Sequence, residues 1–165
     1  MTRSPDGTIS PPTSRSLAAE RVTLVVRRDP LLVEAGSNVW HVIDRMRAAR
    51  GEPALIVREG RLVGIFTERD VLLKVLGREV PADEIVDTYM KPNPQTLTAT
   101  ATLGEAAHIM DRGQFRNVPI VDAEGQPVAN LRQQDILEYI AEAFPAEILN
   151  LPPRPHQRLE EPEGA

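Results

Sequence analysis

The side chains of this chain best suited to bind a ligand are those of Thr67 and Asp70, which are three positions apart at the end of a short apolar run. Thr67 falls where a predicted strand gives way to a predicted helix, so the free backbone N–H groups of the first helical turn face any anion bound there. A hydroxyl at this point can donate to a phosphate oxygen, and a carboxylate one turn away can accept hydrogen bonds from two neighbouring hydroxyls. The pair therefore suits a ligand that carries a phosphate and a pair of hydroxyls.

The stretch Thr67–Asp70 also has the spacing of a capping box, in which a hydroxyl and an acidic residue stabilise the start of a helix without any ligand. A second stretch, Arg132–Asp135, keeps the acidic residue but has Arg where the first stretch has its hydroxyl. A carboxylate near a helix N-terminus is mildly favourable in any case. At the level of these residues, both interpretations, binding and capping, stay open.

Other chemistries are excluded or lack a motif. The chain has no cysteine, which excludes disulfides, thiolate metal sites and cysteine nucleophiles. Its histidines lack the carboxylate spacing of a metal site, and there is no Walker phosphate loop, nucleophile elbow or Ser–His–Asp arrangement. We therefore expect no catalytic residue, no metal site and no required cofactor, and we do not expect an enzyme.

Charge and hydropathy argue against two further classes of partner. The formal net charge of −5 disfavours a general nucleic-acid surface, which needs a basic face to neutralise phosphates. Apolar runs stay well below the roughly 20 residues that a membrane-spanning helix requires, and Met1–Ser16 does not resemble a signal peptide. We expect a cytoplasmic protein that binds neither nucleic acid nor membrane.

An internal repeat places the two acidic residues in equivalent positions. With one residue of slippage before the glycines, the matched pairs are Pro30 with Pro94, Val39 with Leu103, Met46 with Met110, Gly60 with Gly125 and Asp70 with Asp135. In each copy the first apolar segment has the i, i+3, i+4, i+7 spacing of an amphipathic helix. Two short apolar runs around each glycine then predict a β-hairpin.

A second helix is expected after each acidic residue, and in the first copy its apolar face comprises Val71, Leu72, Val75 and Leu76. Each copy thus predicts strand, helix, strand, strand, helix. A unit of roughly 60 residues buries little apolar surface alone, so we expect the copies to pack on each other. The predicted fold class is α+β, with repeats at residues 20–82 and 83–144. The predicted tails, 1–19 and the Pro-rich 145–165, are expected to be flexible.

Several motif blocks resemble the CBS-domain family. The segment Gly64–Asp70 resembles its signature, Gly-apolar-x-Thr/Ser-x-x-Asp, at the junction of the third strand and second helix. Phe115–Asp122 resembles the entry to the family's second strand, and Tyr89–Pro92 resembles its Met-Thr-Pro lead-in, with Lys in place of Thr. The blocks occur in order and cover roughly residues 20 to 144.

The resemblance implies a regulatory module of two β-α-β-β-α repeats related by a pseudo-twofold axis. Clefts in this family commonly hold AMP, ADP, ATP or S-adenosylmethionine, and two modules often join into a disc-shaped homodimer. By resemblance, Thr67 contacts the phosphate and Asp70 the ribose. Gly64 belongs to the same signature, and an apolar wall that includes Leu55 and Ile65 would flank the adenine.

The second site departs from the family pattern. Asp135 is retained, but Arg132 replaces the hydroxyl and either grips a phosphate bidentately or fills the cleft with its bulk. Thr96 matches a position that is often Thr near the nucleotide. Arg116 precedes Val118 and Pro119, where the family often has a basic residue that reaches toward phosphates, although a solvated loop arginine explains it equally well. We expect unequal sites, the better one at Asp70.

Two functional hypotheses follow. In the first, the chain is an adenine-nucleotide sensor that signals to an effector protein through a change of shape. In the second, it is a ligand-free dimeric scaffold that recruits partners through its C-terminal segment, where apolar residues precede several prolines between Phe144 and Pro155.

Overall fold

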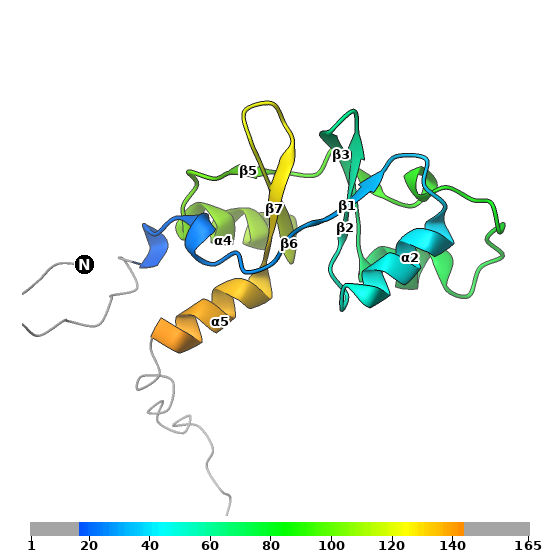
Figure 1. Cartoon of the computed structure of the whole chain (residues 1–165). Coiled ribbons are helices and arrows are strands. Elements are labelled where there is room, and N and C mark those ends of the chain that lie inside the picture. The colour runs from blue at the N-terminus through cyan, green and yellow to red at the C-terminus, as the bar shows by residue number, and fades with distance from the viewer. Residues whose placement is uncertain (1–16, 144–165) are drawn as a thin grey trace, which may run out of the picture.

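The computed structural model describes residues 17–143, which form two βαββα units that lie side by side (Figure 1). The predicted tail 145–165 lies outside the described residues, and only residues 17–19 of the predicted tail 1–19 are described. The first unit comprises β1 (Leu31–Glu34), α2 (Val39–Ala48), β2 (Ala54–Arg58), β3 (Arg61–Phe66), α3 (Glu68–Asp70) and η2 (Val71–Val75). The second comprises β5 (Leu97–Thr98), α4 (Leu103–Gly113), β6 (Asn117–Val121), β7 (Pro127–Arg132) and α5 (Gln133–Ala143). The predicted α+β fold with two tandem repeats is confirmed.

The two sheets are built in the same order. In the first, β1 pairs in parallel with β2 and β2 pairs antiparallel with β3, and in the second β5, β6 and β7 repeat this arrangement. The first sheet gains a fourth strand, β4 (Lys91–Pro92), on the far side of β3. At the start of each hairpin the register is equivalent, because Ala54 faces Phe66 as Val118 faces Leu131. The next residues, Thr67 directly after β3 and Arg132 at the end of β7, therefore occupy corresponding positions.

The segment that leads into each repeat packs in the core of the other repeat. Before the first repeat, η1 (Val22–Leu24) brings the fully buried Val22 into the core built around β6 and β7, and the backbone N–H of Val22 donates to the carbonyl of Ala101 at 3.0 Å. Before the second repeat, η3 (Val86–Thr88) brings the fully buried Val86 into the core of the first, and its N–H donates to the carbonyl of Ser37 at 2.9 Å. This reciprocal exchange gives each small unit the apolar surface that it lacks alone.

The second helix of the first repeat differs from its predicted form. After one α-helical turn it continues as a π-helix, in which the N–H of Leu76 donates to the carbonyl of Val71, five residues back. The wider turn changes the positions of successive side chains, so Val71 and Val75 pack toward the core while Leu72 and Leu76 do not. Of the predicted apolar face, Val75 is buried, whereas Leu72 and Leu76 are 63% and 55% exposed. The predicted apolar face is therefore only partly buried, and these two leucines lie outside the core.

Among the helices described between residues 17 and 143, none has the length and apolar character needed to cross a lipid bilayer.

Candidate functional site

A cleft of about 800 Å³ lies where the first repeat's signature segment meets the α4–β6 connection of the second repeat. This volume falls within the range typical of small-molecule sites. The lining residues are Gly51, Pro53, Ile65, Thr67, Glu68, Arg69, Asp70, Leu72, Lys91, Gly113, Gln114, Phe115, Arg116 and Asn117. Because both repeats contribute, a molecule bound here would contact the two halves at once.

Thr67 and Asp70 form the capping box that their spacing suggests. The backbone N–H and the hydroxyl of Thr67 donate to Oδ2 of Asp70 at 3.0 and 2.7 Å, and the N–H of Asp70 donates back to the Thr67 hydroxyl oxygen at 3.4 Å. The capping interpretation is thus confirmed. The same bonds hold the carboxylate in one orientation at the edge of the cleft, so capping does not compete with a binding role.

Lys74 is a neighbour of Asp70 that sequence reasoning missed. Its ammonium lies 2.8 Å from Oδ1 of Asp70 and donates to the carbonyl of Tyr89 at 2.6 Å. Since a carboxylate has about four acceptor positions, the three donors from Thr67 and Lys74 leave room for a further hydrogen bond. The i, i+4 spacing of Asp70 and Lys74 was the signal available in the sequence.

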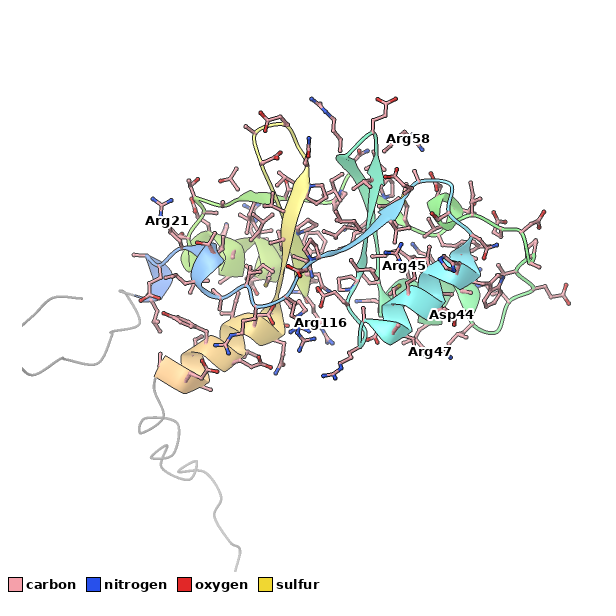
Figure 2. The ribbon with its side chains drawn as sticks, in the orientation of Figure 1. Arg21, Asp44, Arg45, Arg47, Arg58 and Arg116 are labelled. Atoms are coloured by element: carbon pink, nitrogen blue, oxygen red, sulfur yellow. The ribbon has the colours of Figure 1, made fainter. Side chains whose placement is uncertain are left out.

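The facing wall of the cleft carries positive charge and an aromatic ring. The ammonium of Lys91 lies 3.9 Å from the centre of the Phe115 ring, a cation–π contact between the first sheet's β4 and the second repeat. Arg116 follows Phe115 with an exposed side chain, and Figure 2 shows it where the two repeats meet. Neither Lys91 nor Phe115 was assigned to the site from the sequence, although both stood inside quoted motifs.

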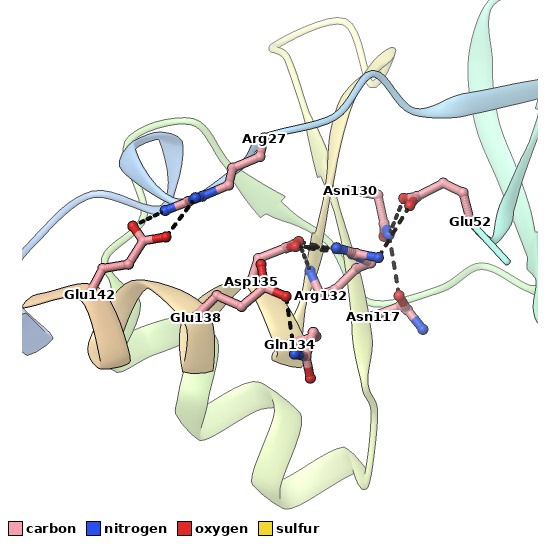
Figure 3. Close-up of polar contacts among 9 residues, drawn as sticks. All are labelled: Arg27, Glu52, Asn117, Asn130, Arg132, Gln134, Asp135, Glu138 and Glu142. Atoms are coloured by element: carbon pink, nitrogen blue, oxygen red, sulfur yellow. Dashed lines mark hydrogen bonds and ion pairs between the residues drawn. The ribbon is translucent and has the colours of Figure 1, made fainter. Parts of the chain in front are cut away.

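The corresponding place in the second repeat has a different chemistry (Figure 3). Asp135 is only 3% exposed, and its carboxylate accepts from the backbone N–H and Nε of Arg132 at 3.1 Å and also from Nη2. The hydrogen bond to Asp135 raises the pKa of Arg132 above its ordinary value, so the guanidinium remains charged. Nη1 of Arg132 lies 3.7 Å from a carboxylate oxygen of Glu52, a buried residue of the first repeat.

The remaining candidate residues from the sequence do not line the cleft. Leu55 and Val118 are fully buried strand residues, Pro119 is buried beside Val118, and Thr96 is exposed between β4 and β5. Gly64 lies against Met90, whose sulfur would be 2.2 Å from a Cβ built at Gly64. The structure therefore brings together Ile65, Thr67, Asp70 and Arg116 from the predicted set. In the part of the chain that is described, no group of three or more His, Asp or Glu side chains is placed to hold a metal ion.

Comparison with known proteins agrees with this architecture. The CBS domain family model matches residues 20–77 and again residues 84–142. A CBS domain-containing protein of Arabidopsis thaliana, CBSCBSPB5, is 34% identical over 100 residues, which make up 60% of this chain and 18% of that protein. The chain therefore corresponds to a small part of this relative's length.

Two solved structures share the fold. The structure of CBSX2 in complex with AMP superposes with a TM-score of 0.66 at 18% identity, covering 74% of this chain and 97% of that one. The CBS domain pair of protein MJ0100, in complex with 5′-methylthioadenosine and S-adenosyl-L-methionine, gives a TM-score of 0.66 at 20% identity, covering 73% and 98%. With one family match on each repeat, the chain belongs to the CBS domain family and carries two CBS domains in tandem.

Proposed function

We propose that this chain is a regulatory module that binds an adenosine ligand in the cleft at Asp70 and passes the signal to an effector protein. The observation that carries the proposal is the composition of that cleft, where a hydroxyl–carboxylate pair of one repeat faces the basic loop of the other. The complexes of CBSX2 with AMP and of MJ0100 with S-adenosyl-L-methionine support the ligand class.

The cleft divides into parts that suit the parts of a nucleotide. The remaining acceptor position of Asp70 suits a ribose hydroxyl, and the apolar surfaces of Ile65 and Leu72 suit adenine. Arg116 and Lys91 suit a phosphate, because a guanidinium or ammonium group makes charge-assisted hydrogen bonds to its oxygens. This distribution of charge favours AMP, ADP or ATP over an uncharged adenosine derivative.

Signalling follows if the ligand binds two arrangements of the repeats with different affinity. A ligand with equal affinity for both arrangements shifts nothing, however tightly it binds. The cleft meets the structural requirement, because its walls belong to different repeats and a ligand that contacts Asp70 and Arg116 favours one spacing between them.

We also propose that a second copy of the chain covers the exposed leucines of the second helices. Leu72 and Leu73 of η2, Leu76 directly after η2 and Leu137 of α5 are each more than half exposed. These helices occupy equivalent places in the two repeats, so a twofold-related copy can cover both with one surface. The alternative role, a scaffold that acts through its C-terminal segment, rests on residues outside those described.

The decisive experiment is calorimetric titration of the whole chain with AMP, ATP, S-adenosylmethionine and GMP, repeated with Asp70→Asn. We expect selective binding of an adenosine ligand that weakens at least about tenfold in the variant, because a hydrogen bond to a charged group contributes roughly 1.5–3 kcal/mol. Asp44→Asn, which changes an exposed carboxylate on α2 that pairs with Arg47, is the matched control and should bind as the unmodified chain does. Equal affinity in Asp70→Asn would refute the assigned site.

A further inference from the structure

The place in the second repeat that corresponds to the cleft at Asp70 (the first cleft), where Arg132 and Asp135 meet Glu52, is named the second cleft, and its charges are arranged in the opposite way. Glu52 stands two residues before Ala54, and Arg116 stands two residues before Val118, so they occupy corresponding positions ahead of paired strands. In the first cleft the signature residue is Thr67 and the facing residue is the cation Arg116. In the second, the signature residue is the cation Arg132, and the facing residue is the anion Glu52.

In the second cleft the charged side chains pair with one another, so the cation is already engaged. Arg132 is held by Asp135 from its own repeat and approaches Glu52 of the other repeat, and the side chains are 17%, 4% and 5% exposed respectively. Asn130 extends the contact between repeats, since its amide donates to Glu52 at 3.2 Å (Figure 3). The same amide donates to Asn117 of its own repeat at 3.3 Å. The guanidinium thus lies between two buried carboxylates.

We infer that Arg132 and Glu52 close the second cleft to phosphate-bearing ligands, so that each chain holds a single nucleotide. The inference rests on the proposed function of the first cleft. A ribose would find about four acceptor positions of the Asp135 carboxylate already engaged by Arg132, since the backbone N–H, Nη2 and an Nε shared between both oxygens all donate to it, whereas Asp70 accepts only three. A phosphate would meet the buried carboxylate of Glu52 where the first cleft presents Arg116, and repulsion between like charges is strong at a site shielded from water. Arg132 and Glu52 also connect the two repeats directly. At the corresponding place in the first cleft, a ligand would make this connection.

The first measurement is the stoichiometry of AMP binding to the unmodified chain and to Asp70→Asn, by calorimetry. We expect one AMP per chain, lost in the variant. Two AMP per chain would overturn the closure of the second cleft while leaving the proposed function intact. Absence of any adenosine ligand binding to the unmodified chain would overturn both. This measurement changes nothing at the second cleft, so it does not depend on how a variant there folds.

The second measurement opens the cleft. Glu52→Gln combined with Arg132→Thr removes both charges together, restores the signature hydroxyl beside Asp135 and keeps an amide for Asn130. Removing Arg132 alone would leave Glu52 as a buried carboxylate without its cation. We expect two AMP per chain, and one in the same double variant carrying Asp70→Asn. Asp44→Asn with Arg47→Thr, which removes an exposed ion pair on α2, should retain one. A folded double variant that still binds one AMP per chain would overturn the inference.

Discussion

At the scale of single residues, the same atoms serve the helix and the cleft. The bonds between Thr67 and Asp70 start the second helix and also hold the carboxylate toward the space between the repeats. A matching capping box at Thr102 and Glu105 starts α4 but lies outside the cleft. The two boxes therefore allow the cost of losing a cap to be separated from the cost of losing a ligand contact.

We predict that Thr67→Val and Thr102→Val each lower the free energy of unfolding by about 1 kcal/mol, the usual cost of losing a hydroxyl cap. Thr67→Val should also weaken AMP binding, because it removes the hydroxyl that donates to Asp70 and frees the Asp70 carboxylate to rotate. Thr102→Val should leave affinity unchanged. Urea denaturation and calorimetry measure the two effects, and equal affinities in the two variants would argue against a binding role for Thr67.

At the scale of elements, the lead-in segments join the repeats more firmly than their order in the chain suggests. The 3₁₀ turn before the first repeat contains Val22, which is fully buried in the second repeat's core, and Leu24, which is 61% exposed. Loss of packing at Val22 therefore acts directly on the second repeat. The first repeat responds as well because its own core contains Val86 from the other lead-in.

We predict that Val22→Ala destabilises the chain by about 2 kcal/mol, from the lost burial of two carbons and the cavity that remains. Leu24→Ala in the same turn should stay within about 0.5 kcal/mol of the unmodified chain. The fluorescence of Trp40, on α2 of the first repeat, and far-ultraviolet circular dichroism should report the same shifted transition for Val22→Ala. A Trp40 transition that does not move would show that the repeats unfold independently.

At the scale of the whole molecule, the exposed leucines determine the expected assembly. Exposed apolar surface commonly marks an interface, and here exposed leucines occur at η2 of the first repeat and on α5 of the second. Leu72 and Leu76 lie outside the core that holds Val75, so they remain available for association.

We predict that the unmodified chain sediments as a dimer and that Leu137→Glu shifts it to a monomer, because a carboxylate buried in an apolar interface has no partner. Val128→Glu changes a comparably exposed apolar residue on β7 and should leave the dimer intact. Analytical ultracentrifugation at several concentrations distinguishes the cases. A monomer in the unmodified chain would contradict the proposed association.

The amino-acid sequence alone was sufficient to predict the repeat, the order of strands and helices in each copy and the capping box at Thr67. These features depend on local periodicity and on side chains three or four positions apart, which a linear pattern records. Departures at Arg132 also indicated that the two clefts differ. The π-helical continuation of the first repeat was not predicted, because its apolar spacing is compatible with an ordinary α-helix.

Only the tertiary structure decided which residues face one another across the repeats. Glu52 and Asn130 are 78 positions apart in the chain, and nothing in the local sequence around either one indicates their hydrogen bond. The same holds for Lys91 over Phe115 and for Val22 in the second repeat's core. Local sequence determines how each repeat folds. The exchange of lead-in segments determines how the two repeats pack against each other. The chemistry of both clefts depends on this packing, because each cleft combines residues of both repeats.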